Sequence, residues 1–167
     1  MEDHLLRCLD GSLAIDDTSK LMDAISRSKR ILYLLDNAGE IVFDKFLMQI
    51  IKEKYPVKIF AAVKSAPVLN DATLEDAEQI GLGEVAEVIT TGNDHMGINL
   101  DESSEEFLQS LHEADLIIAK GQGHYESMTE VEHLLSKPIV YVLRAKCALV
   151  AESLGVQQYG NVVKAVM

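Results

Sequence analysis

The sequence predicts an α/β fold in which a mostly parallel β-sheet lies between two layers of helices. Six short runs of aliphatic and β-branched residues recur along the chain, with starts roughly 23 to 30 residues apart, which is typical of strand–helix–strand units. The runs are apolar almost throughout, as strands buried on both faces are. The segments between them have helical periodicity, and this alternation favours a parallel sheet in a three-layer α/β/α arrangement.

The expected strands follow one another without a linker or an internal repeat. They are residues 31–35, 57–63, 85–90, 115–119, 139–143 and 162–166. Because consecutive strands of such folds are usually adjacent, the first two should be neighbours in the sheet. Ligands of these folds bind at the carboxyl ends of the strands, so chemistry is expected in the loops that follow the strands.

Four helices are marked by capping residues or by apolar periodicity. Asp16, Asp17 and Thr18 begin a helix that ends near Arg27, and the hydroxyls and acids at 103–106 begin another. A further helix has its apolar face formed by Phe43, Phe46, Leu47, Ile50 and Ile51. The last has an apolar pattern at 128–135 and stops before Pro138.

Composition limits the functions to be considered. The chain has 167 residues, which suits a single domain, 1–167, with a helical lead-in at 1–28 and a core at 29–167. A net charge of −12 argues against binding to nucleic acid or to an anionic membrane, since both require clustered cations. Neither a signal peptide nor an apolar run of membrane-spanning length is seen, so we expect a soluble, cytoplasmic protein.

The loop after the first expected strand offers oxygen ligands. Asp36 stands where the apolar run stops, Asn37 follows it, and Gly39 allows a tight turn towards the next helix. A carboxylate and an amide oxygen side by side suit Mg²⁺ or Mn²⁺. The alternative is a plain turn, because Asp-Asn-x-Gly is common turn chemistry.

The loop after the second expected strand carries Asp71. Taken alone, Asp71 can simply cap the helix that follows, because Asp is a favoured N-cap. If the first two strands are neighbours, however, Asp36, Asn37 and Asp71 lie around one point. Two carboxylates so close repel each other unless a cation lies between them, so the pair favours a metal site.

Cations follow the fourth and fifth expected strands. Lys120 precedes a Gly-Gln-Gly stretch at 121–123, which resembles a phosphate cradle made of backbone N–H groups and one lysine. The third glycine of a dinucleotide-binding motif is absent. Arg144 and Lys146 add positive charge at the same edge of the sheet. The alternative is that these cations only pair with acids on the surface.

Four segments together resemble one known family. They are residues 35–45 (LDNAGEIVFDK), 69–73 (LNDAT), 114–123 (ADLIIAKGQG) and 143–147 (LRAKC). In this order they closely resemble the DUF89 proteins, also known as the damage-control phosphatase or ARMT1-like family. The resemblance begins near Leu21. By this resemblance the chain is expected to be a short form that lacks most of the helical region which family members carry ahead of this domain.

The resemblance implies a Rossmann-like α/β/α fold and a phosphatase activity that depends on Mn²⁺, Co²⁺, Ni²⁺ or Mg²⁺. It implies that Asp36, Asn37 and Asp71 are the metal ligands. It also implies a phosphate-binding group made of Lys120, Gly121, Gln122, Gly123, His124 and Lys146. Two departures lie on the substrate side: His124 stands where Asn is expected, and Ser65-Ala66 replaces a pair that contains glycine.

We therefore expect hydrolysis of phosphomonoesters of small metabolites, such as sugar phosphates or damaged phosphometabolites. The metal would bind a phosphoryl oxygen and lower the pKa of a water molecule, while the lysines would stabilise the phosphoryl charge. Asp71 or Glu40 would accept the proton, and Asp36 is a less favoured candidate for a covalent nucleophile. The rival functions are a non-catalytic metal- or metabolite-binding module and a carboxyl methyltransferase. A homo-oligomer is one way in which a short form would cover an open site.

Overall fold

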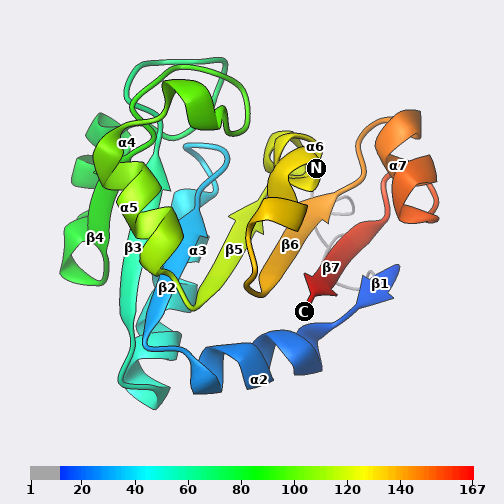
Figure 1. The fold of residues 1–167 in the computed structure, drawn as a ribbon, viewed down its shortest axis with the longest axis horizontal. Coiled ribbons are helices and arrows are strands. Elements are labelled where there is room, and N and C mark those ends of the chain that lie inside the picture. The colour runs from blue at the N-terminus through cyan, green and yellow to red at the C-terminus, as the bar shows by residue number, and fades with distance from the viewer. Residues whose placement is uncertain (1–11) are drawn as a thin grey trace, which may run out of the picture.

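The computed structural model describes residues 12–167. Its centre is a seven-stranded sheet with the strand order β1-β7-β6-β5-β2-β3-β4 (Figure 1). The strands are β1 (Ile15–Asp16), β2 (Arg30–Leu34), β3 (Lys58–Val63), β4 (Glu87–Thr90), β5 (Leu116–Lys120), β6 (Ile139–Arg144) and β7 (Asn161–Val166). The helices are α2 (Thr18–Arg27), α3 (Ile41–Lys54), α4 (Leu74–Gln79), α5 (Glu105–Glu113), α6 (Gln122–Val131) and α7 (Ala148–Leu154), with short 3₁₀ helices at Leu82–Glu84, Leu100–Glu102 and Glu132–Leu134.

Most of the sheet is parallel, as predicted. The strands from β4 through β3, β2 and β5 to β6 are parallel neighbours. β7 departs from this pattern because it runs antiparallel to β6, so that Asn161 pairs with Arg144 and Val166 pairs with Ile139. β1 runs parallel to β7. The start of β7 therefore lies at the edge formed by the carboxyl ends of β2 to β6.

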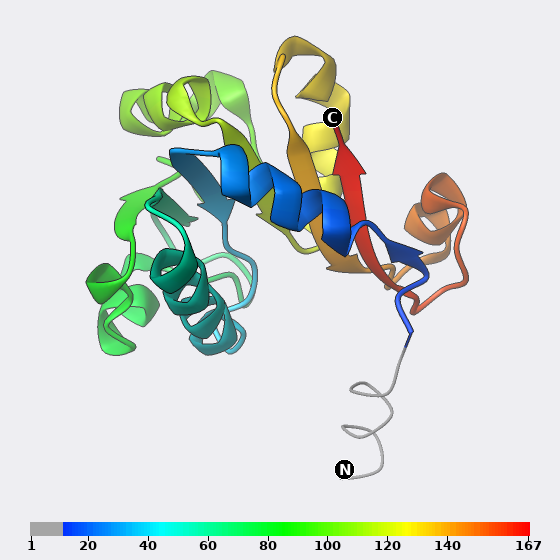
Figure 2. The same cartoon turned by 90° about the horizontal axis from the view of Figure 1, so that it is seen from below.

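Two apolar clusters fill the spaces on either side of the sheet, because successive residues of a strand face opposite ways. In β2, Ile31 and Tyr33 join one cluster with α2, α3 and α4, whereas Leu32 and Leu34 join the other with α5, α6 and α7. Figure 2 shows α3 and α4 on one side of the sheet and α5 and α6 on the other. This arrangement confirms the predicted three-layer α/β/α fold.

All six predicted strands are present, with ends that differ by no more than two residues from the prediction. The predicted helical lead-in contains α2 but also β1, whose two residues are too few to show a periodicity. Residues 1–11 of that lead-in lie outside the described part of the chain. The helix predicted from the pattern at 128–135 has different bounds: α6 begins at Gln122, and the apolar pattern continues beyond its end into a 3₁₀ turn.

The helices are short, and the longest one described, α3, has 14 residues. Within residues 12–167, no helix combines the length and the apolar composition needed to cross a bilayer.

Candidate functional site

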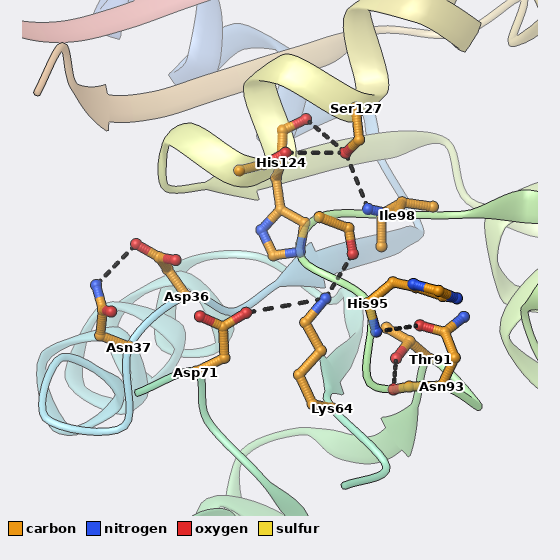
Figure 3. A network of polar contacts seen from close by, with 12 residues as sticks. Asp36, Asn37, Lys64, Asp71, Thr91, Asn93, His95, Ile98, His124 and Ser127 are labelled. Carbon is orange, nitrogen blue, oxygen red and sulfur yellow. Dashed lines mark hydrogen bonds and ion pairs between the residues drawn. The ribbon is translucent and has the colours of Figure 1, made fainter. Parts of the chain in front are cut away.

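The loops that follow β2 and β3 are joined by main-chain contacts. The Ala72 N–H donates a hydrogen bond to the Asp36 carbonyl oxygen at 2.8 Å. Asn37 and Asp71 form an isolated antiparallel bridge between the same two loops. Asp36, Asn37 and Asp71 therefore lie together, as the adjacency of the first two predicted strands implied (Figure 3).

The Asp36 carboxylate is packed between its own loop and the start of α6. Its Oδ2 accepts a hydrogen bond from Asn37 Nδ2 at 2.8 Å. On the other side lies Gly121, where φ is +83° and where an added Cβ atom would collide with the carboxylate. Only glycine meets both demands at this position. Burial first, and then the negative charges of Glu40 and Asp71, raise the pKa of the Asp36 carboxyl to about 6.

Asp71 does not cap a helix. The cap of α4 is Thr73, which forms a capping box with Asp76: the Thr73 hydroxyl accepts from the Asp76 N–H, and the Asp76 carboxylate accepts from the Thr73 N–H. The Asp71 carboxylate is thus free to face the site, with its Oδ2 3.9 Å from Lys64 Nζ. Burial raises the pKa of Asp71, while the positive charges of Lys64 and Lys146 oppose this rise.

Lys64 belongs to the same group, although it was not among the residues predicted from the sequence. It is only 2 % exposed, and its Nζ donates a hydrogen bond to the Gly97 carbonyl oxygen in the loop after β4. Burial lowers the pKa of the Lys64 ammonium, and attraction to Asp71 and Asp36 opposes this. The available signal was a lysine at the end of a buried apolar run, which is also how Lys120 is placed.

Lys120 is paired, and its main partner is buried. Its Nζ lies 2.8 Å from Asp44 Oδ1 in α3 and 3.8 Å from Glu40 Oε2. The same Asp44 oxygen accepts a hydrogen bond from the Tyr33 hydroxyl at 2.6 Å. Pairing with surface acids alone is therefore the wrong interpretation for Lys120, because Asp44 is only 3 % exposed.

The stretch 121–123, predicted to bind phosphate through backbone N–H groups, forms the start of a helix. Helix α6 begins at Gln122, with Gly121 as its N-cap residue, so these residues form the first turn of a helix. Gln122 Oε1 accepts a hydrogen bond from the Lys146 N–H at 3.0 Å, which joins this turn to the loop after β6. The first N–H groups of a helix have no intrahelical acceptor, so this end of α6 can still bind an anion.

His124 is buried in the same turn. Its Nδ1 lies 2.6 Å from the Lys120 carbonyl oxygen. Burial and, after it, the positive charge of Lys64 lower the pKa of the His124 imidazole to about 4. The side chain is therefore neutral at pH 7, and its one proton lies on Nδ1, which donates to the Lys120 carbonyl oxygen. Its Nε2 is then an acceptor, so in this state the imidazole gives a phosphate neither a hydrogen bond nor a positive charge.

Two hollows meet at Asp36, Gln122 and Lys146. The inner hollow has a volume of about 220 Å³ and extends to Asp71. The outer hollow has a volume of about 320 Å³ and extends to Lys120. Because both hollows share these three residues, a ligand bound between Asp36 and Lys146 could extend into either hollow.

The two remaining predicted cations differ in their surroundings. Lys146 is exposed, and its charge lowers the pKa values of both Asp36 and Asp71. Arg144 lines the outer hollow, where its Nε donates to the Tyr159 carbonyl oxygen at 3.1 Å and its guanidinium lies 5.5 Å from the centroid of the Tyr159 ring. Lys146 therefore acts on both carboxylates of the pair.

The ligand set fits a hard divalent cation. Asp36 and Asp71 offer carboxylates, and Asn37 adds an amide oxygen, which accepts a hydrogen bond from Asn70 Nδ2. In the described part of the chain, no three carboxylate, histidine or cysteine side chains converge, so water and phosphate oxygens would complete the coordination, as is usual for Mg²⁺. A cation between the two carboxylates would offset the burial that raises both pKa values and the carboxylate repulsion that adds to the pKa of Asp36.

Comparison with known proteins finds relatives in three organisms. An uncharacterized protein of Methanocaldococcus jannaschii is 55% identical over 156 residues, which are 92% of this chain and 51% of that protein. A protein of Pyrococcus horikoshii named damage-control phosphatase is 38% identical, over 93% of this chain and 53% of its own length. A damage-control phosphatase of Archaeoglobus fulgidus is 40% identical, over 98% and 55% respectively. This chain thus spans about half the length of the curated relatives it matches.

The fold agrees with that relationship. The crystal structure of a DUF89 family protein from Pyrococcus horikoshii matches with a TM-score of 0.89 and 38% identity, covering 97% of this chain and 56% of that one. The model of the damage-control phosphatase ARMT1-like domain matches residues 1–162, so the match also includes the residues ahead of Leu21. The chain belongs to the damage-control phosphatase ARMT1-like family, also called DUF89.

Proposed function

We propose that this chain is a divalent-metal-dependent phosphatase that hydrolyses phosphomonoesters of small metabolites, such as sugar phosphates or damaged phosphometabolites. The observation that carries this proposal is the convergence of Asp36 and Asp71, two half-buried carboxylates with raised pKa values, beside the first turn of α6. The relatives named damage-control phosphatases support it.

Asp36, Asn37 and Asp71 would hold the cation, for which Mn²⁺, Co²⁺, Ni²⁺ and Mg²⁺ are the candidates. The cation would supply positive charge that polarises the phosphoryl group and lowers the pKa of water. Asn37 now presents its Nδ2 to Asp36 and to Glu40, at 2.8 Å from each acceptor oxygen. Its amide would therefore have to rotate to turn its oxygen towards the cation.

The phosphoryl oxygens would be bound by Lys146 and by the free N–H groups at the start of α6. Lys120 would add positive charge from the outer hollow, where its ion pair with Asp44 fixes its position. Because these groups are in place before the substrate arrives, little reorganisation is needed as charge develops on the phosphoryl oxygens.

In the proposed reaction, water attacks phosphorus, and the bond between phosphorus and the alcohol oxygen breaks. The proton of the water passes to a carboxylate, and the alcohol takes up a proton from solvent. Glu40 is a better acceptor than Asp71, because Asp71 is needed as a ligand. Glu40 lies beside the proposed ligands, since its Oε1 is 2.8 Å from Asn37 Nδ2.

The test is hydrolysis of p-nitrophenyl phosphate by metal-stripped protein to which each of the four metals is added back. We expect turnover that requires metal and is lost in Asp36→Ala. A matched control is Asp23→Ala, which removes an exposed carboxylate of α2 and should behave as the wild type. No turnover with any metal, although metal binds, would refute the proposal.

That outcome would favour a second function, a non-catalytic metal-binding module. The observation in favour of this alternative is that the chain spans about half the length of its curated relatives. Calorimetric titration of the wild type and of Asp71→Ala with Mn²⁺ would test this function. A metal-binding module would bind Mn²⁺ in the wild type and lose that binding in Asp71→Ala. A chain that neither binds metal nor hydrolyses phosphate esters would give no binding signal in either protein.

A further inference from the structure

Two large apolar side chains stand at the inner hollow, whose other lining residues are mostly polar or charged. Leu69 comes from the loop after β3 and is 81 % exposed. Met96 comes from the loop after β4 and is 67 % exposed. Single exposed apolar residues are common on protein surfaces. Two of them from separate loops, at one hollow that also contains Asp36 and Asp71, call for an explanation.

The backbone of Leu69 is strained. Its φ is +49°, in the left-handed region that leucine rarely adopts. A turn closed by the hydrogen bond from the Asp71 N–H to the Val68 carbonyl oxygen, at 3.0 Å, contains this residue. Glycine or asparagine would adopt this conformation at a lower cost in free energy. Backbone strain of this kind tends to occur at functional sites.

The loop that carries Met96 is held firmly in place. The Lys64 ammonium donates to the Gly97 carbonyl oxygen, and the Ile98 N–H donates to Ser127 Oγ at 2.9 Å. Gly97 has a φ of +71°, and an added Cβ atom there would collide with Ser127 and Gly123 of α6. The position of Met96 at the hollow is therefore set by the contacts of the two residues that follow it.

We propose that Leu69 and Met96 form an apolar rim that binds the alcohol part of the phosphate ester. The polar groups of the hollow would take the phosphoryl group, and the rim would contact carbon atoms beside it, as the apolar walls of small-molecule sites do. Preferred substrates are then esters whose alcohol carries an aromatic or aliphatic group near the phosphate. This inference rests on the proposed phosphatase function and specifies its substrate class.

The experiment measures phosphate release from phenyl phosphate and from glycerol 1-phosphate. The quantity of interest is the ratio of the two kcat/KM values, because differences in intrinsic reactivity cancel when the ratio is compared between variants. Leu69→Gly and Met96→Ala should each lower the preference for phenyl phosphate about 10-fold, which corresponds to the loss of one apolar contact. Inhibition by inorganic phosphate should not change.

Three further variants separate substrate binding from a structural role. Leu149→Ala and Met167→Ala remove side chains that are 77 % and 64 % exposed, respectively, away from the hollow, and should leave the ratio unchanged. Leu69→Met should restore most of the preference that Leu69→Gly loses. Leu69→Gly should also unfold at a higher denaturant concentration than the wild type, because glycine relieves the strain at φ +49°. A lower preference in a more stable protein cannot come from unfolding.

The outcomes of these experiments distinguish a failure of the apolar rim from a failure of the phosphatase function. If the wild type hydrolyses both esters in a metal-dependent way and the ratio is the same in all variants, the rim is wrong and the phosphatase function stands. Leu69 and Met96 would then be assigned to contact with another polypeptide segment. If the wild type hydrolyses neither ester, the phosphatase function fails. The rim is then tested by binding: weaker binding of phenylphosphonate, but not of methylphosphonate, by Leu69→Gly would support it, and equal binding would overturn it.

Discussion

Asp44 and the pair Asp36–Asp71 are carboxylates of one molecule in contrasting surroundings. Asp44 is 3 % exposed, and its Oδ1 accepts hydrogen bonds from Tyr33 at 2.6 Å and from Lys120 at 2.8 Å. Its Oδ2 is buried without a hydrogen-bond partner among the described residues. The carboxylates of Asp36 and Asp71 face the inner hollow, and the closest ion pair that either makes with a described residue is the 3.9 Å contact between Asp71 and Lys64.

The comparison shows that burial alone does not identify a functional carboxylate. Asp44 is more buried than Asp36, yet its charge is balanced by an ammonium at hydrogen-bonding distance. The pair lacks such a partner, and burial raises both of its pKa values. We therefore expect that removing charge from the pair abolishes activity at little cost in stability, and that removing charge from Asp44 does the reverse.

The largest expected effect is on activity in Asp36→Asn. Loss of this carboxylate should lower kcat/KM at least about 1,000-fold, because a metal site contributes several kcal/mol to transition-state stabilisation. In the metal-free protein at pH 7, the same variant should gain about 1 kcal/mol in the free energy of unfolding, since a carboxyl whose pKa is raised to about 6 destabilises the fold when ionised, and solvent screens part of this effect. Kinetic assays and urea unfolding measure the two quantities. A clear loss of stability would contradict the comparison.

The next effect is on stability in Asp44→Asn. This variant removes the nearer and more buried counter-charge of the Lys120 ammonium and leaves only Glu40, at 3.8 Å, and we expect a loss of about 3 kcal/mol in the free energy of unfolding. Urea denaturation followed by circular dichroism measures it. The matched control is Glu84→Gln, which breaks the exposed pair with Lys45 and should unfold at the same urea concentration as the wild type. Equal effects of the two substitutions would show that the burial of Asp44 is irrelevant.

The third effect is on the pH dependence of stability, through the buried His124 beside the cation of Lys64. The pKa of His124 is lowered to about 4 in the folded protein by burial and by Lys64, against about 6.5 when unfolded. The unfolded chain therefore takes up a proton below pH 6.5, whereas the folded chain does so only near pH 4, so stability falls as the pH falls through this window. By pH 5 the loss from this group should reach about 2 kcal/mol.

His124→Asn should remove this contribution. Urea unfolding of both proteins at pH 7 and pH 5 checks it, and the difference between the two pH values should be smaller in the variant. An identical difference in the two proteins would show that His124 is protonated in the folded state at pH 5.

The smallest expected effect separates Asp71 from the cap of α4. Thr73→Ala should cost about 1 kcal/mol, because it removes the hydroxyl of the capping box, and it should leave activity near the wild-type value. Asp71→Ala should abolish activity without this loss of stability. If thermal unfolding shows the larger loss in Asp71→Ala, then Asp71 serves the helix after all.

The main features of the fold could be predicted because they depend on local patterns. Parallel strands buried on both faces leave continuous apolar runs, and helices leave a periodicity that the sequence shows directly. The direction of β7 could not be predicted, because a run of apolar residues is the same for a parallel and an antiparallel strand. Strand β1 has only two residues and exists through its pairing with β7.

In the site too, features that follow from local patterns could be predicted, whereas contacts between distant residues could not. Asp36, Asn37 and Asp71 could be placed together because their strands were expected to be neighbours, and the bridge between their loops bears this out. Their roles as ligands remain predictions. The partners of Lys64 and Lys120 could not be predicted, because the contacts join residues 33 and 76 positions apart, respectively, without a pattern that links them.

The reversed direction of β7 has a practical consequence. Its last residues pair with the first residues of β6, with Val166 opposite Ile139, so this strand ends at the edge of the sheet opposite the hollows. Met167 follows and is 64 % exposed. A protein tethered to a sensor chip at Met167 would therefore have its hollows facing solution. Metal and phosphonate binding could then be measured on the chip without the surface blocking the site.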